Sequence, residues 1–383
     1  MEPRLLRITT VPISLKLLLD GQFTFFQQQG FEVLTVSADG SEVSYLKEKG
    51  IPHTVVPMTR LITPLADLYC LFQLIRVIKK FKPDIIHSHT PKAGLLGMMA
   101  AWICRVPVRM HTVAGLPLME ATGLKKWILK ITERITYACA HRIYPNSVGL
   151  MEYIKSQIAN HKSQIAIIGR GSSNGIDTEY FLRNAALEQQ AKTIRAQYGI
   201  SDDVTVFSFV GRIVRDKGII ELVEAIQKMN QVRLLLIGSF ENDLDPLPDE
   251  VTTFINKDER VILAGFQQDV RPWMIASDVF VFPSYREGFP NVVMQAACLE
   301  IPCIVSDING CNEIIQHNET GILVPVKDVD SLYKAMLLLV LDKTKRSSFG
   351  QKSRRFVVKN FDREYVWAEL LKVYRSALEK KKK

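Results

Sequence analysis

The stretch PSYREGFPNVVMQAACLEIPCIVSD, from Pro283 to Asp307, decides the fold because it joins a strand to a helix through a short charged turn. A buried strand is expected to end at Ser284, and a helix to begin near Asn291. Between them stand a charged pair and a Gly-Phe-Pro sequence. A strand followed by a turn and a helix is the repeating unit of α/β folds with parallel sheets.

The same pattern repeats along the whole chain. Short runs rich in β-branched residues alternate with stretches whose apolar residues recur at helical spacing, which predicts βαβ units. The runs are apolar almost throughout, and this indicates that helices cover both faces of each sheet. We therefore predict an α/β fold with two doubly wound parallel sheets. The expected strands include Arg4–Val11, Asp84–His89, Val108–Val113, Val204–Val210, Val232–Gly238 and Asp278–Ser284.

Length and polarity fit two domains. The chain has 383 residues, which is too long for one hydrophobic core. The polar stretch GSSNGIDTEYFLRNAALEQQ, which begins at Gly171, is the best boundary. We predict a first domain over residues 1–175, a second over residues 176–362, and a C-terminal helix over residues 363–383 that ends in a lysine tail.

Composition excludes several classes of protein. With 47% apolar and 23% charged residues, the chain is an ordinary globular protein. Its six cysteines form no C-x-x-C pair, so free thiols in a reducing cytoplasm fit better than disulfides or a zinc site.

The first residues do not resemble a secretory signal, and the longest apolar run, Ala93–Cys104, is too short to span a bilayer. Residues 1–180 carry 21 Lys and Arg against 13 Asp and Glu, so most of the excess positive charge belongs to the first half.

The first strand end with distinctive chemistry is FVGRIVRDKGIIELVEAI, Phe209–Ile226. Gly211 gives a tight turn after the strand, and Arg212 and Lys217 stand just before a helix. Arginine can bind two phosphate oxygens at once, lysine adds a mobile charge, and a helix N-terminus favours anions. These residues predict a diphosphate site, and a solvated basic loop is the alternative that the pattern alone leaves open.

The second such strand end is the stretch quoted first. Glu287 can accept hydrogen bonds from sugar hydroxyls, and Gly288 lets the backbone approach a ligand. Pro290 suits the first turn of a helix, and Gln295 on that turn would reach back toward the ligand. The free amides that would point at the ligand are those near Phe289, Asn291 and Val292. An acid favoured by the helix dipole explains Glu287 alone, but not the whole turn.

Together these motifs resemble glycosyltransferase family 4. The segments VGRIVRDKG and SYREGFPNVVMQAACLEIPCIVSD, followed by Ile308–Asp328, carry the resemblance, and Gly171–Phe181 is similar to the segment that joins the family's domains. The resemblance spans essentially the whole chain. It implies the GT-B fold, in which two Rossmann-like domains face each other across a cleft. The C-terminal helix, here around Arg363–Leu378, would return to the first domain.

The resemblance implies a retaining glycosyltransferase of the hexosyl or N-acetylhexosaminyl type. Its first domain would bind the acceptor and its second domain a nucleotide-diphosphate sugar, with UDP as the expected nucleotide. Arg212 and Lys217 would hold the diphosphate and act catalytically with Glu287, which would contact the donor sugar. The amides from Gly288 to Val292 would line the sugar site. Where the family has a second Glu for the ribose hydroxyls, this chain has Gln295, whose amide can still accept and donate hydrogen bonds.

The first domain departs from the family pattern. Many members have His-Gly after one of its strands, with the His near the transferred sugar. This chain has Ala114 and Gly115 there, and His111 stands three residues before Ala114. The first strand–helix loop also lacks the glycine pair common in the family. Other acceptor or cleft residues are predicted from their position at strand ends, and they are Ser14, His87, His89 and Lys92.

No cofactor and no metal are expected. His87 and His89 point to one face of a strand, but no third ligand is evident. Two other functions stay open: a GT-B sugar-nucleotide epimerase, which would need no acceptor, and a non-catalytic nucleotide-sugar-binding subunit. Nucleic acid is not an expected partner, because no nucleic-acid-binding motif accompanies the positive charge.

The expected partners are a nucleotide-diphosphate sugar and a glycan or lipid-diphosphate-linked acceptor, in the assembly of a capsule, lipopolysaccharide or related polysaccharide. Lysines beside apolar residues in Leu74–Lys82 and Gly123–Arg134 also favour an anionic membrane surface. Ordinary solvated helices are the alternative. We therefore expect a cytoplasmic protein that binds peripherally to the inner face of the membrane.

Overall fold

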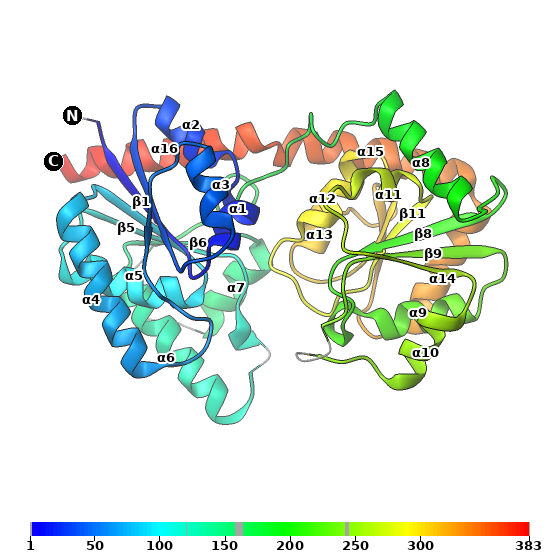
Figure 1. Ribbon diagram of the computed structural model, residues 1–383, viewed down its shortest axis with the longest axis horizontal. Helices are drawn as coiled ribbons and strands as arrows, with labels where there is room; N and C mark the ends of the chain where they lie inside the picture. The colour runs from blue at the N-terminus through cyan, green and yellow to red at the C-terminus, as the bar shows by residue number, and fades with distance from the viewer. Residues whose placement is uncertain (1, 120, 158–163, 242–244, 383) are drawn as a thin grey trace. The chain divides into compact units, whose positions relative to one another are not determined.

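The computed structural model describes residues 2–119, 121–157, 164–241 and 245–382. The chain forms two compact units (Figure 1). Unit 1 comprises Met1–Gly175 and Arg363–Lys383, and unit 2 comprises Ile176–Asp362. The last helix of the chain therefore belongs to the same unit as the first strand. Lys383, the final residue of the lysine tail, lies outside the described residues.

Unit 1 is built on a parallel sheet. Its described residues form seven strands in the order β3-β2-β1-β4-β5-β6-β7, and each neighbouring pair is parallel. Successive side chains of a strand point to opposite faces of the sheet. Leu5 and Leu6 are nevertheless both fully buried, because helices cover both faces. The strands are β1 (Arg4–Ile8), β2 (Glu32–Ser37), β3 (His53–Val55), β4 (Ile85–His89), β5 (Val108–Val113), β6 (Arg142–Pro145) and β7 (Gln164–Ile165).

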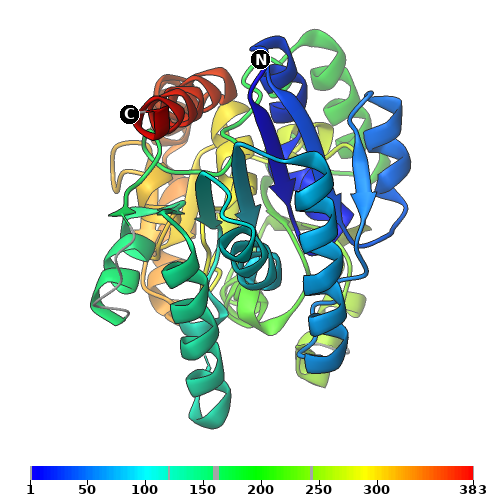
Figure 2. The same cartoon turned by 90° about the vertical axis from the view of Figure 1, so that its left-hand side faces the viewer.

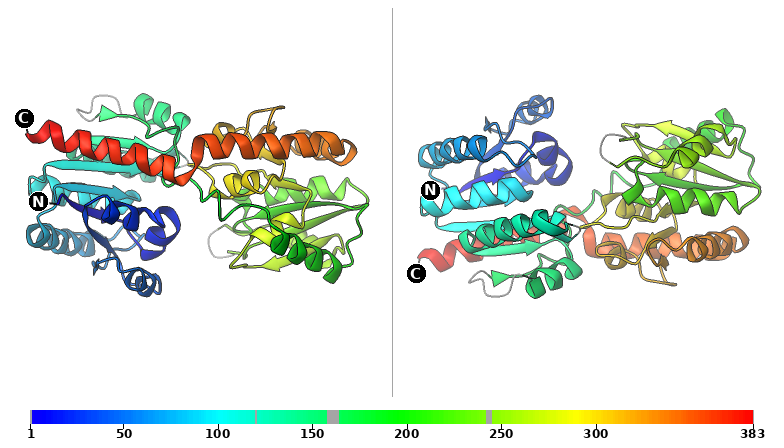
Figure 3. Two further views of the ribbon diagram at one scale, coloured as in Figure 1. Left: turned by 90° about the horizontal axis from the view of Figure 1, so that it is seen from above. Right: turned by 90° about the horizontal axis from the view of Figure 1, so that it is seen from below.

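Two helical layers cover this sheet. Leu5 packs in one core cluster with α1 (Pro12–Leu19), α2 (Gln22–Gln28), α3 (Glu42–Glu48) and α16 (Arg363–Lys382). Figure 3 shows α16, in red, lying along the strands. Leu6 packs in the opposite cluster with α4 (Pro64–Phe81), α5 (Pro91–Ile103), α6 (Gly123–Cys139) and α7 (Val148–Gln157). A 3-10 turn, η1 (Pro117–Met119), precedes α6.

Unit 2 repeats this architecture. Its described residues form a six-stranded parallel sheet in the order β10-β9-β8-β11-β12-β13. The strands are β8 (Thr205–Val210), β9 (Val232–Ile237), β10 (Val261–Gly265), β11 (Val279–Phe282), β12 (Cys303–Ser306) and β13 (Gly321–Val324). The helical elements are α8 (Ala185–Gln197), η2 (Arg215–Lys217), α9 (Ile219–Gln227), α10 (Asp249–Lys257), α11 (Arg271–Ile275), α12 (Asn291–Cys298), α13 (Cys311–Ile314), α14 (Val329–Leu341) and α15 (Lys343–Phe361).

Both sheets reverse their strand order beside the first strand of the unit. In unit 1 the reversal lies between β1 and β4, and in unit 2 it lies between β8 and β11. The loops after these strands diverge there, which leaves room for a ligand at the carboxyl edge of the sheet. The two doubly wound parallel sheets predicted from the sequence are confirmed.

Candidate active site

The predicted donor residues lie in the two loops at the reversal point of unit 2. One loop follows β8 and leads through η2 into α9, and the other follows β11 and leads into α12. The strands themselves are paired, with Val279 opposite Phe207. Lys217 and Glu287, which are 70 positions apart in the sequence, therefore come together.

Close contacts hold the two loops against each other. Gly218 has a φ of 71°, and a Cβ atom there would lie 2.1 Å from the carbonyl oxygen of Pro283, so no larger residue fits. The amide of Tyr285 donates to the carbonyl of Asp216 at 2.9 Å. Arg286 donates to the carboxylate of Asp216 at 2.8 Å. These contacts fix the spacing of the two loops.

Lys217 and Glu287 form an ion pair where the loops meet. The Nζ of Lys217 lies 2.5 Å from Oε1 of Glu287, which also accepts a hydrogen bond from the Ser284 hydroxyl at 3.0 Å. Only 14% of the Lys217 side chain and 16% of the Glu287 side chain are exposed. Charges interact more strongly in such a place than in open water. The predicted diphosphate cation and the predicted sugar-binding carboxylate are thus direct neighbours.

Arg212 lies at the rim of the same site. Its side chain is 45% exposed and donates to Glu241 at 3.0 Å, and its other terminal nitrogen lies 4.0 Å from the Asp216 carboxylate. Exposed ion pairs of this kind typically contribute only about 0–1 kcal/mol. A diphosphate could therefore take Arg212 from these acids at little cost, because it accepts two hydrogen bonds from one guanidinium.

Two glycines outside the predicted set shape these loops. A Cβ atom at Gly238, which follows β9, would lie 1.8 Å from the carbonyl oxygen of Gly211. A Cβ atom at Gly310 would lie 2.5 Å from the carbonyl oxygen of Gly288. Both glycines have positive φ, 146° and 76°. Their signal in the sequence is a glycine at or soon after the end of an expected strand.

The start of α12 differs from the prediction at two residues, Pro290 and Gln295, neither of which lies in the first turn. Pro290 does not lie in the first turn, because its φ of −78° and ψ of 109° make it the extended residue that precedes the helix. The helix begins at Asn291, as predicted. The amides of Asn291 and Val292 then have no carbonyl within the helix to bind, so they are suited to a ligand. Gln295 lies in the second turn, where its side chain is partly exposed.

Phe289 has a different role from its neighbours. Its side chain is only 8% exposed, and its ring packs on Phe361 with a centroid distance of 5.1 Å. The ring therefore anchors the turn in the core of unit 2. Only the backbone of Phe289 is suited to face a ligand.

His87 and His89 are stacked and buried in unit 1. Their rings lie 4.4 Å apart, on the sheet face that α16 covers. The Nδ1 of His87 is 2.6 Å from the hydroxyl of Tyr374, and its Nε2 is 2.7 Å from that of Thr112. The Nε2 of His89 is 2.9 Å from a terminal nitrogen of Arg7. Burial lowers the pKa of both histidines well below the usual value, so both rings are neutral at pH 7.

His111 lies on the opposite face of the sheet. Its Nδ1 is 2.9 Å from the Ser88 hydroxyl, and its ring packs so closely on α5 that a Cβ atom at Gly94 would lie 2.4 Å from it. Burial lowers its pKa to about 4. The structure therefore does not bring His111 together with His87 and His89, and it gives His111 a place in the core.

The other two predicted residues of unit 1 are also held by local contacts. Lys92, in the first turn of α5, pairs with Asp67 of α4 at 2.6 Å, and only 12% of its side chain is exposed. Ser14 is a partly exposed residue of α1. Both follow strands at the reversal point of unit 1, β4 and β1. Their assignment to an acceptor site stays a prediction.

Comparison with known proteins identifies the family. A model described as "Glycosyl transferase 4-like domain" matches residues 26–171, and one described as "Glycosyl transferases group 1" matches residues 204–342. The capsular polysaccharide biosynthesis glycosyltransferase CapM of Staphylococcus aureus is 34% identical over 98% of this chain and 97% of its own length. The chain belongs to the group 1 glycosyltransferases of family 4.

Other relatives of this glycosyltransferase are consistent with this family assignment. A protein of Escherichia coli named UDP-Gal:alpha-D-GlcNAc-diphosphoundecaprenol alpha-1,3-galactosyltransferase is 29% identical over 84% of this chain and 83% of its own length. The structure of Anabaena HepE in complex with UDP and glucose has a TM-score of 0.82 at 19% identity, over 98% of this chain and all of that one. Sucrose-phosphate synthase from Thermosynechococcus elongatus has a TM-score of 0.78 at 20% identity, over 98% of both chains. These structures share the GT-B fold with the glycosyltransferase.

The named relatives also bear on the alternatives left open above. They are glycosyltransferases, and neither an epimerase nor a non-catalytic subunit finds support among them. At the position where the family has its His-Gly pair, the carbonyl of Ala114 accepts a hydrogen bond from the Asn146 side chain at 3.2 Å. Within the described ranges, no three His, Cys, Asp or Glu side chains are grouped so as to hold a metal ion.

Proposed function

We propose that this glycosyltransferase moves a sugar, with retention of configuration, from a UDP-linked donor to a lipid-diphosphate-linked glycan during polysaccharide assembly. The observation that carries the proposal is the Lys217–Glu287 pair with Arg212 at its rim. The names of relatives support the substrates: UDP-Gal and a GlcNAc-diphosphoundecaprenol for the E. coli protein, and capsular polysaccharide for CapM. HepE was crystallised with UDP and glucose.

The donor residues would act by exchanging partners. Arg212 and Lys217 would bind the diphosphate, and Glu287, released from Lys217, would accept hydrogen bonds from the donor sugar. The amides from Gly288 to Val292 would line the sugar site, and Gln295 would contact the ribose. Each charge that loses a protein partner thus gains a ligand partner, which avoids the cost of an unpaired, partly buried charge.

The proposed chemistry needs no protein nucleophile. The bond between C1 of the donor sugar and the diphosphate oxygen breaks, and the bond between C1 and the acceptor oxygen forms on the same face. The acceptor proton passes to the leaving diphosphate. The protein supplies orientation and stabilises the charge on the leaving group. We propose that Arg212 and Lys217 provide this stabilisation without a metal or cofactor.

Donor binding and turnover test the proposal. We expect nucleotide-diphosphate sugars to raise the melting temperature, with UDP-sugars the most effective, and we expect a glycosylated lipid only when undecaprenyl-diphosphate-linked GlcNAc is also present. An altered donor sugar without any acceptor would indicate an epimerase instead. Donor binding with no product on any lipid-linked extract would indicate a binding subunit.

A membrane surface is the second part of the proposal, because exposed apolar side chains line the start of α4. Leu65, Leu68, Tyr69 and Phe72 recur at the spacing of one helix face, and each is more than half exposed. The opposite face of α4 is buried in the core of unit 1. Folded proteins rarely leave such a stripe bare unless it meets a partner.

The start of α6 carries a matching group. Leu124 and Trp127 are 73% and 62% exposed, and the exposed Lys125 and Lys126 lie between them. Both helices begin at the carboxyl edge of a parallel sheet, and α5 packs between them (Figure 2). Apolar side chains beside lysines favour an anionic lipid surface, at about 1 kcal/mol for each basic residue.

The two lysine clusters named from the sequence are not equivalent. Lys79 and Lys80 lie in the last turn of α4, at the edge of the sheet opposite to the exposed apolar stripe. We therefore assign membrane contact to Lys125 and Lys126 with the apolar residues of α4 and α6. Among the described residues no helix is long and apolar enough to cross a bilayer. We propose peripheral binding at the cytoplasmic face, where the six free thiols would stay reduced.

A further inference from the structure

Two ion pairs of this protein are alike in distance and in shielding from solvent, and only one of them has a role so far. The Nζ of Lys217 and Oε1 of Glu287, in the proposed donor site, are 2.5 Å apart, and the side chains are 14% and 16% exposed. The Nζ of Lys92 and Oδ1 of Asp67 are 2.6 Å apart, and the side chains are 12% and 18% exposed. The Lys92–Asp67 pair is thus the counterpart in unit 1 of the donor-site pair in unit 2.

Lys92 also lies where the strand order of its sheet reverses. It follows β4 in the first turn of α5, and the reversal lies between β4 and β1. The loops after these two strands are joined by the hydroxyls of Thr10 and Thr90, which are 2.8 Å apart. Sheets of this kind bind ligands at their carboxyl edge beside the reversal. Lys92 is therefore at the place in unit 1 that corresponds to the donor loops of unit 2.

The residue two positions before Lys92 has an unusual backbone conformation. Thr90 has a φ of 71° and a ψ of 146°, although β-branched residues rarely adopt a positive φ. Such strained conformations cluster at ligand-binding and active sites. Two hydrogen bonds to Thr10 hold Thr90 in place, since its hydroxyl also accepts from the Thr10 amide at 3.1 Å. The loop therefore keeps a conformation that a plain connection between a strand and a helix does not need.

The ammonium group of Lys92 has three partners, and all of them are oxygen atoms of residues 61–67. They are the carboxylate of Asp67, the hydroxyl of Thr63 at 3.3 Å and the carbonyl of Leu61. An ammonium group donates three hydrogen bonds, so a ligand oxygen must replace one of these partners. Asp67 can give up Lys92, because it also accepts from the Thr63 hydroxyl at 2.9 Å and lies in the first turn of α4, where the helix dipole favours an acid.

The segment that holds Lys92 also belongs to the edge that we assign to the membrane. Leu61, Ile62 and Leu65 are 72%, 63% and 87% exposed. Because α5 packs between α4 and α6, Lys92 lies between the two groups of residues proposed to contact lipid. Charged groups are excluded from hydrocarbon, so the diphosphate of a lipid-linked acceptor stays at the level of the lipid headgroups. Lys92 is thus a shielded cation close to the level at which that diphosphate would arrive.

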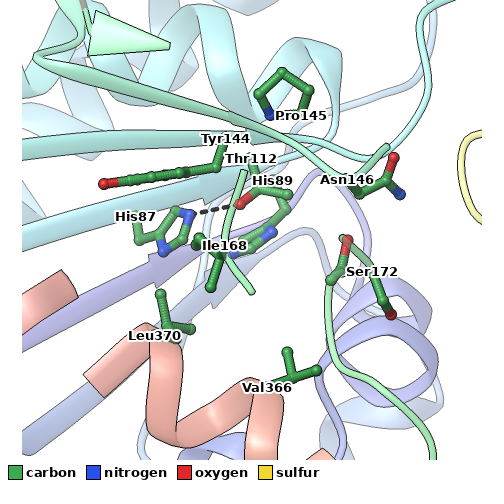
Figure 4. Close-up of a pocket in the computed structure, with 11 residues that line it drawn as sticks. His87, His89, Thr112, Tyr144, Pro145, Asn146, Ile168, Ser172, Val366 and Leu370 are labelled. Carbon is green, nitrogen blue, oxygen red and sulfur yellow. Dashed lines mark hydrogen bonds between the residues drawn. The ribbon is translucent and has the colours of Figure 1, made fainter. Parts of the chain in front are cut away.

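A small cavity near these strand ends cannot hold the diphosphate. It lies between the ends of β4 to β6 and α16, and its lining includes His87, His89 and Leu370 (Figure 4). Its volume of about 10 Å³ leaves room for no more than one water molecule. It is also on the sheet face that α16 covers, whereas α5 covers the opposite face. A diphosphate in unit 1 therefore has to bind outside this cavity.

We propose that Lys92 binds a phosphate group of the lipid-diphosphate-linked acceptor, and that this group replaces Asp67 as its partner. A phosphate oxygen forms a charge-assisted hydrogen bond as the carboxylate does, so Lys92 keeps an anionic partner throughout. A neutral hydroxyl would not replace a carboxylate in this way. That the phosphate belongs to the acceptor rests on the proposed function, but the phosphate site at Lys92 does not.

Titration calorimetry of the full-length protein with geranyl diphosphate, a short prenyl diphosphate, tests the site. With UDP in excess, we expect Lys92→Ala to weaken binding of this probe by about 10- to 100-fold, the usual effect of losing a hydrogen bond to a charged group. Lys217→Ala, the matched control in unit 2, should bind the probe as the wild type does. Absence of binding to the wild type, or equal affinity in Lys92→Ala, overturns the proposal.

Asp67→Asn distinguishes ligand binding from a purely structural ion pair. Asparagine can still accept from the Thr63 hydroxyl, but it no longer competes for the charge of Lys92. We expect the melting temperature to fall while affinity for geranyl diphosphate rises by about fivefold, the upper end for a solvent-accessible ion pair. Unchanged or weaker probe binding in this variant overturns the proposal. If Lys92→Ala alone does not fold, Lys92→Ala with Asp67→Asn leaves no unpaired charge and should show the same loss of probe binding.

The source of the phosphate is decided by two further measurements on Lys92→Ala. We expect its KM for undecaprenyl-diphosphate-linked GlcNAc to rise about 10-fold or more, and its KM for a neutral alkyl glycoside of GlcNAc to rise far less. Binding to phosphatidylglycerol vesicles should be unchanged. Loss of vesicle binding with an unaltered KM for the diphosphate acceptor would assign Lys92 to a phospholipid headgroup and overturn the acceptor assignment. If the wild type used no GlcNAc acceptor, the proposed function would fail, and calorimetry would still decide the phosphate site.

Discussion

The Nζ of Lys217 lies 2.5 Å from Oε1 of Glu287, although different strands carry the two residues to this place. Each side chain neutralises the other in a site that is largely shielded from solvent. A ligand that offers only a diphosphate, or only hydroxyls, would leave one of the two charges without a partner. We therefore expect a UDP-sugar to bind more tightly than either UDP or the free sugar.

Removing either cation should reduce turnover. We expect Arg212→Ala and Lys217→Ala each to lower kcat by about 10²-fold or more, the usual effect of losing a group that stabilises developing charge. Their effects on stability should differ. Arg212 is exposed, so its loss should leave the melting temperature nearly unchanged, whereas Lys217→Ala leaves Glu287 without its ion-pair partner.

A double variant distinguishes the effect of the two charges on stability from their effect on activity. Lys217→Ala combined with Glu287→Gln removes both charges, so we expect it to recover the stability lost in Lys217→Ala without recovering activity. Thermal unfolding and single-turnover kinetics on the same preparations measure the two effects. Near-wild-type turnover in both single variants would show that the diphosphate binds elsewhere.

The close approach at Gly218 gives a prediction with a matched control. Gly218→Ala would push a Cβ atom to 2.1 Å from the Pro283 carbonyl, whereas Gly199→Ala, at a similar φ of 59°, meets no atom within 4 Å. We expect Gly199→Ala to cost about 1 kcal/mol of unfolding free energy and to leave donor affinity intact. Gly218→Ala should cost more and weaken donor binding, because it separates the two loops. Equal effects on donor affinity would contradict this role for Gly218.

A buried acid in α6 predicts a pH dependence of stability. Burial raises the pKa of the Glu133 carboxyl from its ordinary value of 4.5 to about 7, and this outweighs a hydrogen bond with Tyr137 that acts in the opposite direction. Between these two pH values the folded state keeps a proton that the unfolded state releases. The free energy of unfolding therefore carries no penalty from Glu133 below pH 4.5, and it falls as the pH rises to 7. Glu133→Gln removes the titration. We expect its stability advantage over wild type to grow by roughly 2–3 kcal/mol from pH 5 to pH 8.

Denaturant unfolding of both proteins at the two pH values measures this change. The buried histidines titrate in both proteins alike, so the comparison isolates Glu133. A constant difference between variant and wild type across this range would mean that Glu133 titrates at its ordinary pKa.

Vesicle sedimentation tests the proposed membrane-binding surface on α4 and α6. Lys125→Gln with Lys126→Gln should weaken binding to vesicles containing anionic lipid by about 30-fold, which corresponds to about 1 kcal/mol for each lysine. Lys79→Gln with Lys80→Gln changes the net charge equally at the other edge of the sheet and should have little effect. Binding should also fall as salt rises. Equal losses in the two pairs would point to net charge rather than to this surface, and no binding at low salt would remove the membrane from the proposal.

Local sequence determined the architecture and the places where a ligand could bind. Apolar periodicity and glycines at strand ends depend on neighbours within a few residues, so the parallel sheets, the start of α12 at Asn291, and the loops that carry Arg212 and Glu287 could be predicted. The exact position of Pro290 could not be predicted, because the same φ suits the last extended residue before a helix and the first residue within it.

Tertiary structure alone decided which side chains meet. Successive residues of a strand point to opposite faces, so the face of His111 relative to His87 depends on the pairing of β4 with β5, in which Ser88 stands opposite His111. Likewise, the partners of His87 and His89 come from Tyr374 of α16 and Arg7 of β1, far away in the chain. Long-range packing sets these contacts, and no local pattern in the sequence encodes them. For the same reason Lys217 and Glu287 could each be predicted as ligand-binding residues, but only the pairing of β8 with β11 made them partners.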